Sequence, residues 1–224
     1  MLRILHKSKS LVIIYKPQGI PTQSDTSGDA DAMSLTSDML REASEPHALW
    51  LVQRLDRVVG GLIVFARNKE TAAELSALVG GNGMEKEYYA VVEGECEGGE
   101  LRDYIYKDSA KGKAFIVDTE RKGAKAASLE YTPLVKVETE KGIRTLVKIK
   151  LHTGRFHQIR VQFSSRGLPL VGDGKYGSHD NTAKTPALLA ARLAFKTKKE
   201  KIDIKKLPDI DVYPWSLFDE EFYK

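Results

Sequence analysis

The chain has 224 residues, and its 35 lysines and arginines against 31 aspartates and glutamates give a formal net charge of +4 at pH 7. This length is enough to bury a substantial core, and we expect a single domain over residues 1–224. The lone cysteine, Cys96, excludes an internal disulfide and fits a reducing compartment. No stretch resembles a signal peptide or a membrane span, so we expect a soluble, cytoplasmic protein that does not bind a membrane.

Taken in chain order, the first half of the sequence predicts strands, loops and helices. Residues 11–15 form an apolar strand, and the Gly-, Ser- and Asp-rich stretch 23–31 predicts a flexible loop. Residues 33–42 have the apolar spacing of a helix. Residues 70–79 repeat that spacing and are followed by a glycine pair that predicts the helix end.

The second half is predicted to be mostly strand, with antiparallel neighbours and a hairpin turn at Lys141-Gly142. Residues 188–196 are apolar and then basic. The lysine-rich run 196–206 is interpreted either as a solvated surface or as a nucleic-acid contact. The segments with the β-branched or apolar content of strands are 88–93, 114–117, 127–137 and 144–151.

The segment 51–68 places one carboxylate, Asp56, between Arg54 and Arg57 and ahead of the Gly60-Gly61 pair and an apolar strand. Nearby positive charge lowers the pKa of a carboxyl, so Asp56 is expected to be ionised. Held on a loop beside a rigid strand, it could act as a reactive group. The alternative is a structural cluster of ion pairs in a turn, which is common in proteins.

The segment 151–177 concentrates hydrogen-bond donors that suit phosphate and sugar contacts, although a solvated basic face is an alternative. Its apolar residues fit either a two-faced strand or one side of a short helix beginning near His157. A metal site through His152 and His157 lacks a third ligand at a recognisable spacing. The donors are Arg155, His157, Gln158, Arg160 and Arg166.

Four motifs, in order along the chain, resemble the catalytic domain of the RluA family of RNA pseudouridine synthases. The matching segments are Ile13–Gln23, Arg54–Arg57 with Gly61–Val64, Lys86–Tyr88, and Thr153–Arg160 with Gly167–Asp173. Four ordered matches are far more specific than any single short motif. Two positions depart from the family pattern: Gln53 stands where a histidine is usual, and Phe156 where a small hydroxyl residue is commoner.

The resemblance implies an α+β fold, the pseudouridine synthase fold, with a mixed and largely antiparallel sheet, flanking helices and a central catalytic cleft. Some relatives carry an extra N-terminal RNA-binding domain. Here the first strand begins almost at Met1, so we expect none, and RNA recognition would fall to the catalytic domain. We expect the protein to be monomeric.

The reaction that the resemblance implies is conversion of a uridine in ribosomal or transfer RNA to pseudouridine, which needs no cofactor and no metal. Asp56 would be the nucleophile or charge stabiliser, and Arg155 would pair with it. Tyr88 would stack on the base, and its hydroxyl would assist removal of the ring proton. The target base must leave its stack, and Arg54 is a candidate to fill the vacated place.

The modest net charge predicts that RNA is held by basic side chains focused along the cleft, with Lys16 at its rim. The residues expected to bind substrate are Arg54, Arg57, Leu62, Ile159 and Arg160; Ile63 would add to the apolar walls. Two other classes remain: a hydrolase of glycosidic bonds that uses Asp56 with a second carboxylate such as Asp173, and an RNA chaperone without catalysis. Intact Asp56, Tyr88 and Arg155 argue against the chaperone.

Overall fold

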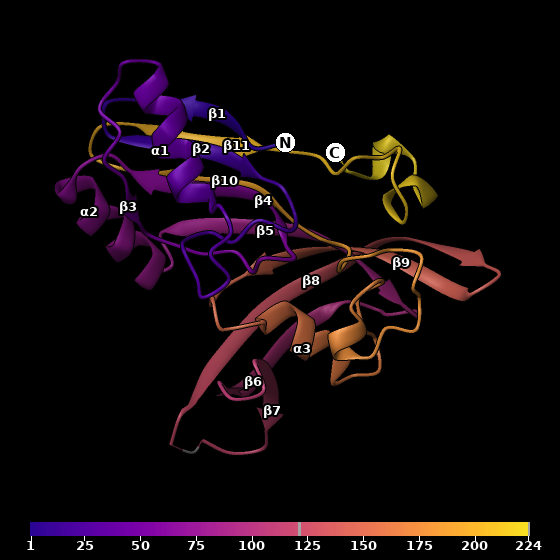
Figure 1. Cartoon of the computed structure of the whole chain (residues 1–224). Coiled ribbons are helices and arrows are strands. Elements are labelled where there is room, and N and C mark those ends of the chain that lie inside the picture. Colours follow the sequence, from indigo (N-terminus) through magenta and orange to yellow (C-terminus); the bar gives the residue numbers. More distant parts are fainter. Residues whose placement is uncertain (121, 224) are drawn as a thin grey trace. The chain divides into compact units, whose positions relative to one another are not determined.

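The computed structural model describes residues 1–120 and 122–223 and divides the chain into two compact units (Figure 1). Unit 1 comprises Met1–Lys86 and Ala190–Lys206, and unit 2 comprises Glu87–Leu189 and Leu207–Lys224. The strands outnumber the helices (Figure 1). Neighbouring strands pair antiparallel in both units. The predicted α+β class is therefore confirmed. A single catalytic domain with a central cleft stays a prediction.

Unit 1 is built on the strand order β1-β2-β4-β10, with β3 paired to β4 and β11 paired to β10. The boundaries between the units fall inside β10, which belongs to unit 1 from Ala190 onward, and inside β5 (Met84–Glu93), which belongs to unit 1 up to Lys86. The elements are β1 (Arg3–Lys7), β2 (Leu11–Lys16), α1 (Ala32–Glu42), β3 (Trp50–Leu51), β4 (Gly60–Ala66), α2 (Lys69–Gly80), β10 (Leu188–Lys196) and β11 (Lys201–Lys205).

The core of unit 1 forms where alternate residues of the strands meet helix α2. Strand β4 is buried along its whole length, and Leu75 of α2 packs in the same apolar cluster as Leu62 and Val64. Helix α2 begins where Asn68 accepts a hydrogen bond from the Thr71 backbone at 2.8 Å, a side-chain cap that satisfies an otherwise unpaired N–H. The apolar periodicity of residues 70–79 therefore predicted a helix that the structure confirms.

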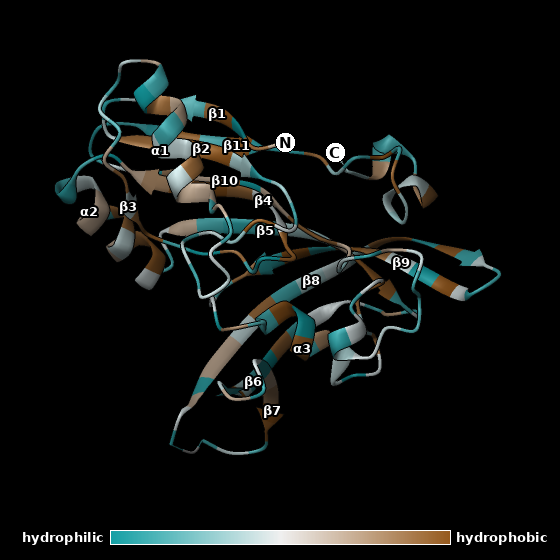
Figure 2. Cartoon of the chain, viewed as in Figure 1, coloured by the Kyte–Doolittle hydropathy of each residue, from teal (hydrophilic) through white to brown (hydrophobic). Residues whose placement is uncertain are grey.

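Unit 2 is an antiparallel sheet in the order β5-β9-β8-β6-β7. The predicted hairpin is confirmed, because Thr139 of β8 pairs with Gly142 of β9. Figure 2 shows hydrophilic and hydrophobic residues alternating along this hairpin. The elements are β5 (Met84–Glu93), β6 (Gly99–Asp108), β7 (Lys113–Val117), β8 (Ala124–Thr139), β9 (Gly142–Leu151), α3 (Gln158–Ser164), η1 (Gly174–Tyr176), η2 (Trp215–Leu217) and η3 (Glu220–Tyr223).

Segment 158–164, which fitted either a strand or a helix, is the short helix α3. Its residues Gln158–Phe163 are all buried, polar and apolar alike. The alternation of polarity was therefore uninformative, because both sets of side chains face protein. Strands β3, β6, β10 and β11 were not predicted. In β11 the two isoleucines point inward and the charged residues Lys201, Asp203 and Lys205 are exposed, so part of the lysine-rich run is the solvated face of a strand.

The C-terminal segment is tied into unit 2 by polar contacts. The Tyr89 hydroxyl donates to the Tyr223 backbone oxygen at 2.6 Å. The Tyr213 hydroxyl donates to Asp180, a buried carboxylate that also accepts from Arg144 at 3.0 Å. Burial by itself would raise the pKa of Asp180, but the hydrogen bonds from Tyr213 and its other donors outweigh it and hold that pKa well below its usual value. The charge is thus retained in the interior.

Gly61, at the start of β4, is required by the close approach of β10. Its φ is +128°, and a Cβ atom would lie 2.3 Å from the Ala190 carbonyl oxygen. The position of a Cβ is set by the backbone, and the atom it would meet is a backbone oxygen, so neither can rotate away. The conformation and the contact each demand glycine at this position.

We therefore expect Gly61→Ala to lower the free energy of unfolding by roughly 3 kcal/mol or more, because it adds backbone strain to an overpacked contact. The matched control is Gly80→Ala at the end of α2, where nothing lies within 4 Å of the added Cβ. That variant should be neutral or more stable by up to about 1 kcal/mol. Urea denaturation of both variants measures the difference, and equal effects would contradict the account of β4.

Candidate active site

Asp56 lies in the loop that joins β3 to β4, and the residue before it is held firmly. The buried Thr22 hydroxyl donates to the Leu55 carbonyl at 2.8 Å and accepts from the Leu55 N–H at 3.1 Å. The Asp56 carbonyl then accepts from Val59 at 3.0 Å, which closes a turn directly before β4. The backbone on both sides of the carboxylate is therefore fixed by hydrogen bonds.

Lys16 supplies a buried positive charge beside this turn. Its side chain is fully buried, and its ammonium donates to the carbonyls of Ile20 at 2.7 Å, Pro17 at 3.1 Å and Arg57 at 3.3 Å. Burial lowers its pKa from 10.5 to about 8; the negative charge of Asp56 opposes this shift and Arg57 adds to it. Lys16 was expected at the rim of a cleft, and that expectation was wrong: it lies inside the protein, next to the loop that carries Asp56.

Arg57 faces the acidic loop 23–31. Its guanidinium donates to Asp29 at 2.5 Å, to Ser27 at 2.6 Å and to Asp25 at 3.0 Å. Hydrogen bonds from Ser27, followed by those from Arg57, lower the pKa of Asp25 to about 2. The loop is thus pinned by Arg57 at one end, and Asp31 caps α1 at the other by accepting from Ser34 at 2.9 Å. Arg54, by contrast, is exposed.

Tyr88 lies in the middle of β5, where it is only 8% exposed. Its backbone pairs with Ile149 of β9. The hydrogen bonds between the two strands fix the Cα atom from which the ring extends. The ring is therefore a rigid apolar platform that carries one hydroxyl.

Arg155 is positioned by a network centred on the buried Gln158. The Gln158 side-chain oxygen accepts from the Arg155 backbone N–H at 3.0 Å and from the Thr153 hydroxyl at 2.7 Å. Its side-chain amide donates to the Ser128 carbonyl at 3.1 Å. Arg155 itself donates from Nε to the Ala126 carbonyl at 2.8 Å. Hydrogen bonds made by the Thr-Gly-Arg-x-His-Gln motif therefore fix both the backbone and the side chain of Arg155.

Arg160 does not present its guanidinium for RNA as expected. It is 4% exposed and forms a two-pronged ion pair with Asp173, at 2.6 Å from Nε and 2.8 Å from Nη2. It also lies 4.9 Å above the Tyr176 ring. This pair holds α3 to the turn before η1. Sequence analysis counted Arg160 as a phosphate ligand because the burial of α3 was not visible in the pattern.

The two apolar residues expected to line the substrate site are core residues. Leu62 is 2% exposed and belongs to the apolar cluster of unit 1. Ile159 is 5% exposed on the fully buried helix α3. Leu62 anchors strand β4, which follows the Asp56 turn, and Ile159 anchors helix α3, which follows Arg155. Their contact with substrate stays a prediction.

Phe156 and His157, which follow Arg155, form a stacked pair with ring centroids 3.7 Å apart. The Nδ1 atom of His157 lies 2.8 Å from the Tyr176 hydroxyl. Burial, followed by the charges of Arg160 and Lys175, lowers the pKa of His157 to about 3, so the ring is neutral at physiological pH. The bulky Phe156, unusual for the family, is thus part of an aromatic packing cluster.

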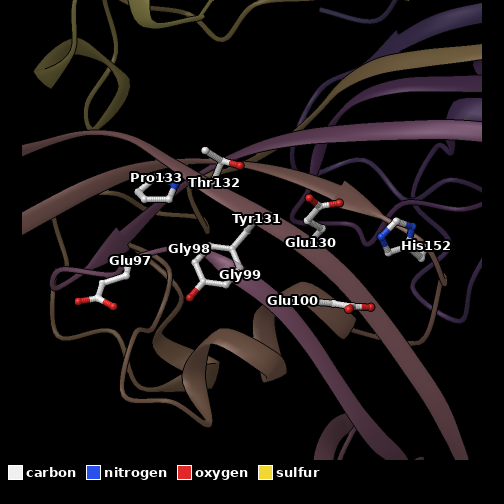
Figure 3. A pocket seen from close by; sticks show the side chains of 9 residues that line it. All are labelled: Glu97, Gly98, Gly99, Glu100, Glu130, Tyr131, Thr132, Pro133 and His152. Carbon is white, nitrogen blue, oxygen red and sulfur yellow. The ribbon is translucent and has the colours of Figure 1, made fainter.

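A separate pocket of about 540 Å³ in unit 2 has an acidic lining (Figure 3). Three glutamates, Glu97, Glu100 and Glu130, line it together with His152 and Tyr131. It contains none of the residues predicted to act in catalysis, and three carboxylates would repel an RNA backbone. In the part of the chain that the structure describes, no group of three or more His, Cys, Asp or Glu residues could hold a metal ion, and no helix is long and apolar enough to cross a membrane.

The low pKa of Lys16 predicts a pH dependence of stability. The unfolded chain keeps this lysine protonated up to about pH 10.5, whereas the folded protein releases the proton near pH 8. Between these values the unfolded state binds more protons, so Lys16 makes the free energy of unfolding rise with pH, by at most about 1.4 kcal/mol per unit.

Lys16→Met should remove this rise. The wild type should therefore gain stability relative to Lys16→Met between pH 8 and 10.5, while the difference is constant below pH 8. Urea denaturation across this range measures both, with Lys69→Met as a control at an exposed position of α2. A constant difference between wild type and Lys16→Met at all pH values would contradict the shifted pKa.

Comparison with known proteins agrees with this geometry. The family model "RNA pseudouridylate synthase" matches residues 10–165, which is more than half of the chain. The matched segment includes Asp56, Tyr88 and Arg155. The chain is similar to tRNA pseudouridine synthase C of Haemophilus ducreyi, with 33% identity over 99% of this chain and 96% of that protein. It is also similar to ribosomal large subunit pseudouridine synthase D of Borreliella burgdorferi, with 28% identity over 100% of this chain and 69% of that protein.

Among solved structures, the chain resembles human RNA Pseudouridylate Synthase Domain Containing 4, with a TM-score of 0.74 and 25% identity. The similarity covers 92% of this chain and 88% of the human one. The sequence motifs, the fold and these similarities agree with one another. The chain belongs to the RNA pseudouridine synthase family, whose members are isomerases that act on RNA.

Proposed function

We propose that this protein converts specific uridines of transfer or ribosomal RNA to pseudouridine, with Asp56 as the nucleophile. The observation that carries the proposal is the construction of the Asp56 turn. The buried Thr22 hydroxyl binds the backbone of Leu55. The buried Lys16 ammonium donates to the backbone carbonyl of Arg57. Such support on both sides of one carboxylate suits a group that must be held in place during a reaction.

The reaction is an isomerisation, so nothing is oxidised and no atom is gained. The glycosidic C–N bond of the uridine breaks, the uracil turns while bound, and a bond forms between the same sugar carbon and C5 of the ring. The proton on C5 is lost, and the ring nitrogen that has left the sugar gains one. Asp56 would act by bonding covalently or by stabilising developing charge, and Lys16 supports its ionised form by charge attraction.

Tyr88 and Arg155 supply the other functions the reaction needs. The rigid Tyr88 ring offers a surface on which a detached base can stack, and its hydroxyl is a candidate to assist removal of the C5 proton. Arg155 is anchored through Nε, which orients its planar guanidinium for a carboxylate or phosphate. The exposed Arg54 can stack on bases and could fill the place of a flipped nucleotide.

The choice of transfer or ribosomal RNA as substrate rests on what the relatives are named for. The enzyme is further proposed to be monomeric, to need no metal and to work in the cytoplasm, a reducing compartment that the lone cysteine fits. The hydrolase alternative is weakened by the structure, because Asp173, its candidate second carboxylate, is engaged by Arg160 in a buried ion pair. The chaperone alternative is decided by assay.

The first prediction for this proposal concerns the nucleophile. Asp56→Asn keeps the size of the side chain but cannot form the ester or carry the charge, so turnover should fall by roughly four orders of magnitude. Tritium release from [5-³H]uracil-labelled RNA measures it. The control is Asp38→Asn, an exposed aspartate of α1 that pairs with Arg41 along the helix, which should keep full activity. More than about one per cent residual activity in Asp56→Asn would remove Asp56 from the mechanism.

The second prediction concerns Arg155. Arg155→Lys keeps the charge but loses the Nε anchor and the planar fork, so we expect at least a hundredfold loss in kcat. Arg102→Lys, at an exposed arginine paired with Glu100, is the matched control and should be unaffected. Full activity of Arg155→Lys would mean that only positive charge matters there.

A further inference from the structure

The acidic loop, residues 23–31, is joined to the rest of unit 1 mainly through Arg57. Residues 23–30 are all exposed, whereas the chain is buried just before them at residues 21–22 and just after them at 31–32. Within the part of the chain that the structure describes, every hydrogen bond from residues 23–30 to a residue outside the segment 21–34 involves the Arg57 guanidinium. A segment with exposed side chains and few contacts opens at a lower free-energy cost than the core. The acidic loop can therefore detach while both of its ends stay in place.

The acidic loop carries negative charge only. Its sequence, QSDTSGDAD, contains three aspartates and no lysine or arginine. Two of the aspartates, Asp25 and Asp29, bind Arg57. Hydrogen bonds, chiefly from Ser27 to Asp25 and from Arg57 to Asp29, hold the pKa of both carboxyls below the usual value. Both carboxylates are therefore ionised at physiological pH, so Arg57 is released by a competing anion rather than by protonation.

The Arg57 guanidinium binds the acidic loop with the same atoms that it would use for a phosphate. Nη1 donates to Asp29, and Nη2 donates to Asp25 and to the Ser27 hydroxyl. Carboxylate and phosphate oxygens are equivalent acceptors for a planar guanidinium. The Arg57 side chain is 35% exposed, so it is accessible to an approaching anion. The acidic loop thus occupies a position at which a phosphate group fits.

The backbone of Arg57 is held in place independently of the acidic loop. Its carbonyl accepts from the Gly19 N–H at 2.8 Å and from the buried Lys16 ammonium at 3.3 Å. When a second anion competes for the guanidinium, the loop therefore moves away and the arginine stays.

We propose that the acidic loop is autoinhibitory: Asp25 and Asp29 occupy Arg57 in the free protein, and a phosphate group of the RNA displaces them when substrate binds; this rests on the function proposed above. Because Arg57 directly follows the candidate nucleophile Asp56, the phosphate belongs to the target uridine or to a nucleotide close to it. RNA must open the loop before it gains this contact. The loop therefore lowers the affinity for every RNA by the cost of breaking its own ion pairs.

Two simpler explanations compete with this proposal. In the first, the contacts to Arg57 are ordinary surface ion pairs that RNA does not reach, so neutralising the acidic loop leaves RNA affinity unchanged. In the second, the aspartates repel RNA by their charge alone, whether or not Arg57 is present. The three explanations differ in how the effect of the aspartates depends on Arg57, which a double-mutant cycle measures.

The experiment measures RNA affinity of the full chain in an Asp56→Asn background, so that no turnover intervenes. The probe is labelled total RNA from cells that lack this protein, fragmented to the size of tRNA and titrated by filter retention at one salt concentration. Asp25→Asn/Asp29→Asn should bind it about threefold to tenfold more tightly, because two exposed ion pairs no longer have to be broken. The same double change in an Arg57→Gln background should have no effect.

The matched control is Asp38→Asn/Glu42→Gln, which removes two exposed charges from α1 and should leave the affinity unchanged. Urea denaturation establishes that each variant is folded, and Asp25→Asn and Asp29→Asn singly give the same comparison if the double variant is not.

Unchanged or weaker RNA binding by Asp25→Asn/Asp29→Asn would overturn the proposal. Tighter binding that persists in the Arg57→Gln background would also overturn it, because the aspartates would then act by general repulsion. Failure of the proposed function is seen separately, as absence of pseudouridine formation by the wild-type chain.

Discussion

The candidate site depends on the burial of one ammonium group. Lys16 ends β2 inside the protein and binds three carbonyls, one of which belongs to Arg57, the residue after the candidate nucleophile. A fully buried cation is tolerated only when it is compensated, and here the backbone carbonyls and the charge of Asp56 compensate it together. The same side chain therefore holds the turn in shape and favours the ionised form of the carboxylate. Gly61 completes the arrangement, because it lets β10 approach the strand that follows.

Two of the family motifs, Ile13–Gln23 and Thr153–Arg160, contain a buried polar residue that holds the backbone of a candidate catalytic loop. Thr22 fixes the backbone before Asp56, and Gln158 fixes the backbone at Arg155 through contacts to Thr153 and Ser128. In both cases one buried polar side chain satisfies backbone groups that a loop would otherwise expose. A buried network that is fully satisfied is rigid, which is what a catalytic group on a loop requires.

Sequence predicted those parts of the fold whose signals are local. Helix α2 followed from apolar spacing and a glycine pair, and the hairpin between β8 and β9 followed from Lys141-Gly142 between two β-branched runs. Sequence analysis placed Arg160 and Lys16 where RNA could reach them, whereas the structure buries both, because the burial of a charged residue depends on partners far along the chain. Arg160 pairs with Asp173, and Lys16 lies under the backbone of Arg57. Patterns of polarity place charged residues on surfaces by default, and they fail where a charge is compensated in the interior.

The most direct test of this account is a pseudouridine map of total RNA from cells that lack the protein and are complemented with either wild type or Asp56→Asn. The account predicts one uridine, or a small set, in transfer or ribosomal RNA that is converted with the wild-type chain and unconverted with Asp56→Asn, although both proteins accumulate to the same level. Identical maps with both chains would contradict it, since the modification would then not depend on the carboxylate around which the site is built.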